Sequence, residues 1–242
     1  MDDHQLGADL ARRAGDLLLD LQARDATKDE GDRLSNELIL EQLATARPDD
    51  AVLSEESKDS PERLSRERVW IVDPLDGTRE WGERRTDWAV HVALAFDGVP
   101  RVAAVALPGR GRVLSTADPP PAPPAHEGKL RLLVSRTRPP AIAEYLADAL
   151  DAELVPLGSA GAKAMAVVMG DADVYAHSGG QYEWDSAAPV GVATAAGCHC
   201  SRLDGSPLVY NQPDPYLPDL LVCRADLAGP VLDAVRAAPD TE

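Results

Sequence analysis

Residues 70–78 read WIVDPLDGT, and this stretch decides which fold and which chemistry we expect of the chain. Its first three residues form a short apolar run that predicts a buried strand, and the carboxylates of Asp73 and Asp76 follow at once. Buried carboxylates must be paired or bound to a cation. Gly77 and Thr78 add backbone N–H groups and a hydroxyl, which suit Mg²⁺ together with a phosphate group. The alternative is an ordinary surface turn, because Asp, Pro and Gly are common turn residues.

Two further acidic sites lie where other predicted elements begin or end. The apolar run of VLSEES, residues 52–57, ends at Glu55 and Glu56, and in EWDSAAP, residues 183–189, Asp185 opens a small-residue helix as its N-cap. Three such sites together predict a cation site made of oxygen ligands. Taken singly, the Glu pair fits a solvated acidic loop and Asp185 fits a helix cap without any further role.

These three motifs, in this order, resemble those of the inositol monophosphatase superfamily of Mg²⁺-dependent, lithium-sensitive phosphatases. The motifs are DPLDGT at 73–78, the Glu pair at 55–56 and WDSAA at 184–188. GSAGAK at 158–163 and ADVY at 172–175 resemble the second half of the family, so the similarity covers nearly the whole chain. The resemblance implies a layered α-β-α-β-α sugar-phosphatase fold, α+β in its first half and α/β in its second.

Local details favour one branch of this superfamily. Inositol monophosphatases follow Asp-Gly-Thr with Asn and Phe, whereas REW follows here at 79–81. This triplet, VSR at 134–136 and EWD at 183–185 are similar to the CysQ branch, the 3′(2′),5′-bisphosphate nucleotidases. The resemblance implies hydrolysis of 3′-phosphoadenosine 5′-phosphate (PAP) to AMP, with PAPS as a further candidate substrate, in sulfate assimilation and nucleotide recycling.

Other readings remain open at this point. Within the superfamily, the chain could instead be an inositol-1-monophosphatase with some activity on fructose 1,6-bisphosphate. Outside enzymes, a catalytically silent module could use the same acids to bind Mg²⁺ or nucleotide, but every expected ligand is present, which favours the enzyme. A haloacid-dehalogenase phosphatase is excluded, because its Asp-x-Asp-x-Thr spacing differs by one residue and would turn a strand side chain to the opposite face.

The resemblance also implies roles for individual residues. Glu55, Asp73 and the Leu75 carbonyl would hold the Mg²⁺ that carries the nucleophilic water, while Asp73, Asp76 and Asp185 would hold a second, with two or three ions in all. The expected catalytic residues are Glu55, Thr78 and Asp32, of which Asp32 lies in KDEGD (28–32), just before a predicted helix. The alternative for Asp32 is an ordinary acid near a helix N-terminus.

Substrate contacts are expected from a larger set of residues around these motifs. Arg136 is a good candidate because Arg binds phosphate bidentately and this one follows a strand end. For Lys163 the alternative is a helix-surface position, and for Arg79, Ser135, Arg136 and Ser159 it is a solvated surface position. A Gly-rich loop at 177–182 is placed to contact a base or sugar, with Tyr182 stacking on a purine. The full expected set is Leu75, Asp76, Gly77, Thr78, Arg79, Ser135, Arg136, Ser159, Lys163 and Asp185.

Composition sets the outer bounds. The chain has 242 residues and a net charge of −17, which argues against a nucleic-acid polymer as a partner. No apolar run approaches the ~20 residues of a membrane span, and the N-terminus does not resemble a signal peptide. We therefore expect a cytoplasmic protein with a small phosphorylated substrate and no membrane partner, and a homodimer is compatible with the sequence. Its three cysteines lack metal-ligand spacing and are expected to be buried thiols.

A Pro-rich segment divides the chain. Residues 118–128 read DPPPAPPAHEG, which predicts a semi-rigid connector. It separates an N-terminal α+β half, 1–117, with most metal ligands, from a C-terminal α/β half, 129–242, with Asp185 and substrate contacts. Apolar periodicity predicts helices at about 6–24, 35–46, 141–150, 162–170 and 185–196, and strands at 52–53, 69–72, 89–96, 102–107, 112–115, 130–135, 153–156 and 174–176.

Overall fold

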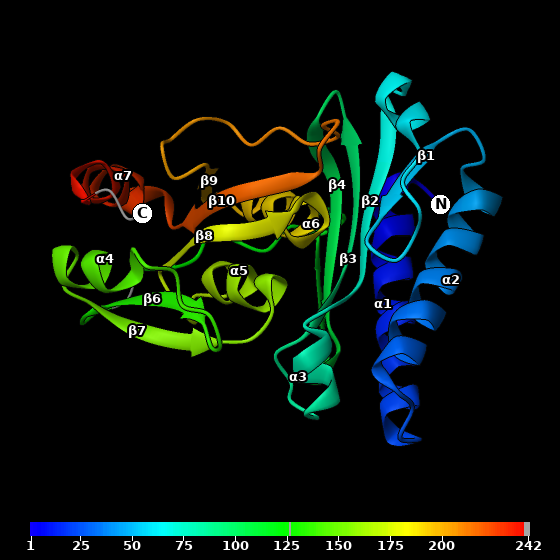
Figure 1. Ribbon diagram of the computed structural model, residues 1–242, viewed down its shortest axis with the longest axis horizontal. Helices are drawn as coiled ribbons and strands as arrows, with labels where there is room; N and C mark the ends of the chain where they lie inside the picture. Colours follow the sequence, from blue (N-terminus) through cyan, green and yellow to red (C-terminus); the bar gives the residue numbers. More distant parts are fainter. Residues whose placement is uncertain (126, 240–242) are drawn as a thin grey trace.

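The computed structural model describes residues 1–125 and 127–239 and contains two five-stranded sheets (Figure 1). The first sheet has the strand order β1-β2-β3-β4-β5. Only β1 and β2 in it run parallel, and the other neighbours are antiparallel. The strands are β1 (Ala51–Ser54), β2 (Arg68–Asp76), β3 (Ala89–Phe96), β4 (Val99–Leu107) and β5 (Arg112–Ser115).

The second sheet has the order β7-β6-β8-β10-β9. Strand β6 runs parallel to both of its neighbours, and β10 runs antiparallel to both of its own. The strands are β6 (Leu130–Ser135), β7 (Ala152–Leu157), β8 (Val174–Tyr182), β9 (His199–Ser201) and β10 (Tyr216–Cys223).

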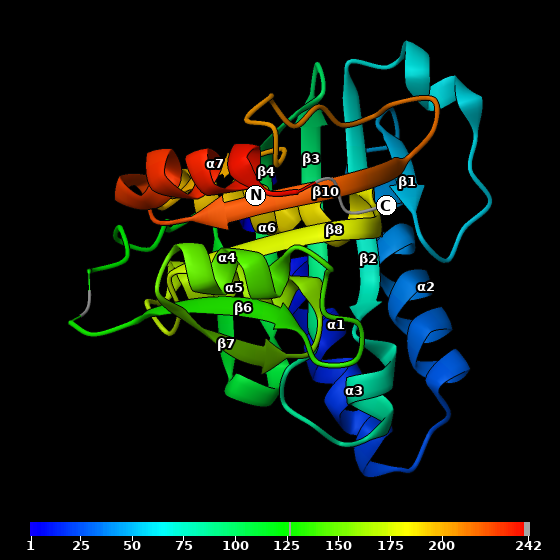
Figure 2. The same cartoon turned by 60° about the vertical axis from the view of Figure 1, so that its left-hand side comes forward.

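Helices cover both faces of each sheet. The helices α1 (Asp3–Ala23) and α2 (Lys28–Ala46) pack on the outer face of the first sheet, where leucines of α1 meet Trp70 and Val92. The helices α5 (Ala160–Val168) and α6 (Glu183–Ala195) fill the space between the two sheets. The helices α4 (Ala143–Ala149) and α7 (Ala228–Ala237) cover the outer face of the second sheet (Figure 2). The result is the expected α-β-α-β-α layering.

Short elements complete the chain. Helix α3 (Thr78–Gly82) follows β2 directly, and 3₁₀ turns lie at Pro61–Ser65, Pro108–Arg110 and Ala225–Leu227. None of the described helices is both long and apolar enough to cross a membrane.

The structure corrects several predicted boundaries. Helix α2 begins at Lys28 rather than Ser35, because Thr27 and Glu30 form a capping box that starts the helix earlier. The predicted Gly-rich loop at 177–182 is instead the second half of β8. Strands β9 and β10 and helices α3 and α7 were not predicted. In β10, Pro218 and Asp219 interrupt the apolar run, and the pairing register shifts at that point.

Candidate active site

A bulge in β2 brings Asp73 and Asp76 onto the same face of the sheet. The predicted strand ended at Val72, but β2 continues to Asp76. Asp73 pairs with His91 and Asp76 pairs with Ala89, so β2 advances by three residues where β3 advances by two. In a regular strand, residues three apart point to opposite faces. The extra residue in β2 therefore turns Asp76 to the same face as Asp73. Pro74 lies inside the bulge, where a missing N–H breaks no ladder hydrogen bond.

The carboxylate of Asp76 is held by the start of α5. Its Oδ1 accepts a hydrogen bond from the Ala160 N–H at 3.1 Å, and its Oδ2 accepts one from the Gly161 N–H at 2.6 Å. A carboxylate at a helix N-terminus is favoured by the helix dipole. Burial alone would raise the pKa of Asp76, but His91, the Gly161 N–H and Lys163 outweigh it and hold this pKa below its ordinary value.

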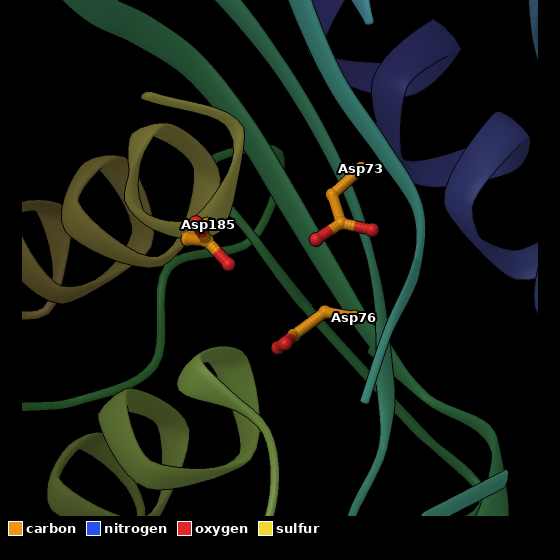
Figure 3. A group of neighbouring side chains, drawn as sticks. All are labelled: Asp73, Asp76 and Asp185. Atoms are coloured by element: carbon orange, nitrogen blue, oxygen red, sulfur yellow. The ribbon is translucent and has the colours of Figure 1, made fainter. Parts of the chain in front are cut away.

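Asp185 reaches the same place from α6. It is the third residue of that helix rather than the predicted N-cap, and its Oδ2 accepts a hydrogen bond from the Tyr182 N–H at 2.7 Å. Carboxylate oxygens of Asp73, Asp76 and Asp185 all lie within 4.8 Å of one another (Figure 3). Burial and the neighbouring acids raise the pKa of Asp73, and burial and Asp76 raise that of Asp185 to about 6.

The chemistry of this carboxylate cluster, Asp73, Asp76 and Asp185, fits a divalent cation. Three converging acids in a buried place repel one another unless positive charge lies between them. The donors are all oxygen, which Mg²⁺ and similar hard cations prefer. The carbonyl oxygen of buried Leu75 lies in the same turn and accepts a hydrogen bond from the Thr78 hydroxyl at 3.2 Å.

Glu55 and Asp32 lie beside the carboxylate cluster rather than inside it. Part of Glu55 is exposed, but its carboxyl group is shielded enough that burial, with Asp185 and Asp32, raises its pKa to about 7. Asp32 is buried within α2, one turn after the helix start, and not before the helix as predicted. Burial and Glu56 raise the pKa of Asp32 to about 7, against a hydrogen bond with the Thr78 side chain that lowers it.

A pocket of about 300 Å³ opens beside the carboxylate cluster. Eight predicted substrate contacts line it, whereas Leu75 and Ser159 do not. The Ser159 side chain instead caps α5 by accepting a hydrogen bond from the Ala162 N–H at 3.0 Å. The predicted residues in the lining are Asp76, Gly77, Thr78, Arg79, Ser135, Arg136, Lys163 and Asp185.

The cationic side chains of Arg136 and Lys163 are held in place by neighbouring groups. The Nη2 of Arg136 donates to Glu80 at 2.9 Å and to Glu83 at 2.7 Å. Lys163 is buried, and its Nζ donates to the carbonyl oxygens of Gly158 and Ser159. Burial lowers the pKa of Lys163 to about 8. An ammonium has three donors, so one hydrogen of Lys163 remains for a ligand.

The pocket wall extends beyond the expected set. Tyr175 and Arg138, which were not predicted, line it, and so do His177 and Gln181 from the segment 177–182 that was expected to contact a base or sugar. Gln181 donates to the Tyr175 hydroxyl at 2.9 Å, while both ring nitrogens of His177 are buried without a hydrogen-bond partner among the described residues. Gly179 and Gly180 made the second half of β8 look like a loop in the sequence. Tyr182 does not line the pocket and is stacked on Trp184, with ring centroids 4.9 Å apart.

We expect the protein without divalent cations to lose stability as the pH rises from about 5 to about 8. A carboxyl with a raised folded pKa binds its proton more tightly when folded than when unfolded, where it titrates at about 4. The stability that this proton provides is therefore lost as the pH rises through the folded pKa, which is about 7 for Asp32 and Glu55 and about 6 for Asp185. His177, whose pKa burial lowers to about 4, opposes the trend, and near pH 8 so does Lys163, whose pKa burial lowers to about 8.

Thermal denaturation in EDTA should show Tm falling by about 4 °C or more over this range, equivalent to about 1–2 kcal/mol for a chain of this length. Excess Mg²⁺ should remove most of the fall, because a cation then neutralises the acids in place of protons. A Tm in EDTA that stays level or rises would contradict the expectation.

Comparison with known proteins gives a consistent result. The inositol monophosphatase family profile matches residues 8–229. The 3′-phosphoadenosine 5′-phosphate phosphatase of Mycobacterium leprae is 53% identical over 97% of this chain and 93% of its own length. The 3′(2′),5′-bisphosphate nucleotidase CysQ of Escherichia coli is 31% identical over 86% of this chain and 94% of its own.

Solved structures show the same fold. The inositol monophosphatase of Anabaena superposes with a TM-score of 0.82 at 22% identity, over 98% of this chain and 96% of its own. CysQ of Bacteroides thetaiotaomicron superposes with a TM-score of 0.77 at 26% identity, over 92% of this chain and 97% of its own. The predicted resemblance, including its nucleotidase branch, is confirmed, and the chain belongs to the inositol monophosphatase family.

Proposed function

We propose that this protein is a metal-dependent phosphatase that removes the 3′-phosphate of 3′-phosphoadenosine 5′-phosphate and releases AMP. The observation that carries the proposal is that one pocket is lined both by acids of the carboxylate cluster and by several cations. One phosphate of the substrate would lie at the cluster, where it is cleaved. The second would be bound by Arg136, Lys163 and Arg138. The names of the relatives in Mycobacterium and Escherichia support this substrate class.

An inositol monophosphate would use this pocket incompletely. It carries a single phosphate, so the cations outside the cluster would have no anionic partner. The neutral wall formed by Tyr175, His177 and Gln181 offers hydrogen-bonding groups suited to a ribose or a base. The preferred substrate is therefore a nucleoside bisphosphate, with inositol 1-phosphate and fructose 1,6-bisphosphate as poorer ones.

The residues that would hold Mg²⁺ are Asp73, Asp76 and Asp185, with Glu55 and the Leu75 carbonyl completing the set. When bound, two or three such ions neutralise the phosphate, lower the pKa of a water molecule and stabilise the leaving oxygen. Gly77 adopts a φ of +90°, and a Cβ there would lie only 2.8 Å from the Ser159 side chain. Glycine therefore allows the turn to pack against the residue before α5. The N–H groups of Gly77 and Thr78 would be the donors to a phosphate.

Proton transfer would be the task of Thr78 and Asp32. The Thr78 hydroxyl donates its hydrogen to the Leu75 carbonyl and also interacts with the Asp32 carboxyl. For catalysis, this hydroxyl would turn its hydrogen from the Leu75 carbonyl to the Asp32 carboxylate and pass it there as Oγ1 takes a proton from the attacking water. A base whose pKa lies near the working pH is the most efficient for such a step.

Substrate comparison tests the proposal directly. We expect kcat/KM for PAP with Mg²⁺ to exceed that for inositol 1-phosphate and fructose 1,6-bisphosphate. Release of inorganic phosphate from each, measured at equal enzyme concentrations, checks this order. A preference for inositol 1-phosphate would show that the nucleotidase assignment is wrong, and no turnover of any substrate would favour the silent binding module.

Metal removal should abolish turnover. We expect exhaustive EDTA treatment to leave no measurable phosphatase activity and added Mg²⁺ to restore it, because the charge of the carboxylate cluster is then again balanced. Li⁺ in the millimolar range should inhibit the Mg²⁺ enzyme, as the family resemblance implies. Full activity after EDTA would contradict the metal mechanism, and insensitivity to Li⁺ would contradict the lithium part alone.

A further inference from the structure

On one face of β3, His91 is a polar residue among alanines. The face of β3 that carries it also carries Ala89, Ala93 and Ala95, which belong to the core between the sheet and the helices α5 and α6. The imidazole itself is completely buried. Burying a polar ring costs free energy unless its nitrogens find hydrogen-bond partners. Packing alone therefore does not explain a histidine at this position.

Both ring nitrogens lie against the segments that supply the carboxylate cluster. Nδ1 is 3.0 Å from the carbonyl oxygen of Trp184, the residue before Asp185. Nε2 is 3.2 Å from Oδ2 of Asp76, although outside hydrogen-bond alignment. Across the sheet, His91 is the strand partner of Asp73. A single side chain therefore lies against both elements that carry the cluster, β2 and α6.

The start of α5 is built around the same ring. The Gly161 N–H donates to Asp76 Oδ2 at 2.6 Å, and a Cβ on Gly161 would collide with Nε2 of His91. Glycine at this position allows the helix, the ring and the carboxylate to meet. His91 does not line the pocket, so it would not touch the substrate.

We infer that His91 is a positioning residue, which fixes Asp76 and the start of α6 relative to each other so that Asp76 and Asp185 present oxygens to the same cation. The inference rests on the metal site proposed above. Groups that orient metal ligands typically contribute about 10–100-fold to metal affinity or activity. The role of His91 should therefore be visible in Mg²⁺ binding without any substrate.

The experiment compares two amide variants. The amide nitrogen of His91→Asn takes the place of Nδ1 and keeps only the Trp184 contact, whereas that of His91→Gln takes the place of Nε2 and keeps only the Asp76 contact. Tm is measured for EDTA-stripped proteins as Mg²⁺ is added. The Mg²⁺ midpoint is the concentration that gives half of the metal-induced rise in Tm. We expect it to increase about 10-fold or more for His91→Asn and by a smaller factor, about 3-fold or more, for His91→Gln. At saturating Mg²⁺, kcat should largely recover.

Val92→Ala is the matched control. Val92 is equally buried in the same strand but points to the opposite face, toward α1. It should lower Tm in EDTA and leave the Mg²⁺ midpoint unchanged. Equal Mg²⁺ midpoints for wild type and both histidine variants would overturn the inference, and so would a Val92→Ala shift as large as theirs. If His91→Asn does not fold, His91→Gln against Val92→Ala decides in the same way. If Mg²⁺ does not raise the Tm of the wild-type protein, the result would instead contradict the proposed metal site itself.

Discussion

Replacing Asp76 by Asn is expected to lower kcat for PAP by about 10²-fold or more, because charge stabilisation is commonly the largest catalytic contribution. The variant removes one negative charge from the carboxylate cluster. It also disturbs the support of that cluster, since both carboxylate oxygens accept backbone N–H groups of α5, at Ala160 and Gly161. In either orientation, the Asn amide turns its own N–H₂ group toward one of those donors.

The measurement is kcat at several Mg²⁺ concentrations up to saturation. Asp50→Asn is the matched control, because Asp50 also accepts hydrogen bonds, from Arg68 at 2.6 Å and from the Trp70 indole at 2.8 Å, but outside the pocket. It should reduce Tm and leave kcat unchanged. A kcat for Asp76→Asn near the wild-type value at saturating Mg²⁺ would show that Asp76 is not a metal ligand.

The fold was predictable where local patterns and family motifs agree. The leucine periodicity of α1 and the apolar runs of β3, β4 and β6 indicate their elements without tertiary information. The start of α2 depends on a two-residue capping box, which the broader periodic pattern obscures. In β10, the register shift beside Pro218 adapts the strand to a sequence that does not read as one. Strand pairing, which is a long-range contact, decided this case.

The candidate site, like the fold, was predictable only in part. The acidic motifs identify Asp73, Asp76 and Asp185, but not the bulge that turns the first two to one face. The burial of Lys163 and the contacts of His91 were also not predictable, because both depend on how α5 and α6 pack between the sheets. These features follow from tertiary contacts between distant segments. From the sequence, Lys163 was expected to contact substrate with a helix-surface position as the alternative, and no role was predicted for His91.

The pairing of Arg136 bears on substrate choice. Nη2 of Arg136 gives both of its hydrogens to Glu80 and Glu83, so it is not free for the bidentate phosphate contact expected from the sequence. The remaining donors are Nε and Nη1. Nε is buried and has no hydrogen-bond partner among residues that the structure describes. The two glutamates therefore orient the guanidinium and leave Nε and Nη1, which lie on different edges of the group, for single hydrogen bonds to a ligand.

Arg136→Ala should weaken PAP hydrolysis far more than inositol 1-phosphate hydrolysis. A hydrogen bond to a charged group is worth about 1.5–3 kcal/mol, so kcat/KM for PAP should fall by about 10–100-fold. The loss is reinforced because Glu80, which is buried, would then face the second phosphate without its cationic partner. For inositol 1-phosphate, which has no second phosphate, we expect a change of less than about 3-fold. Arg110→Ala is the control, because Arg110 pairs with Asp171 outside this pocket and should affect neither substrate. Equal losses for both substrates would mean that Arg136 supports the pocket as a whole rather than binding the second phosphate.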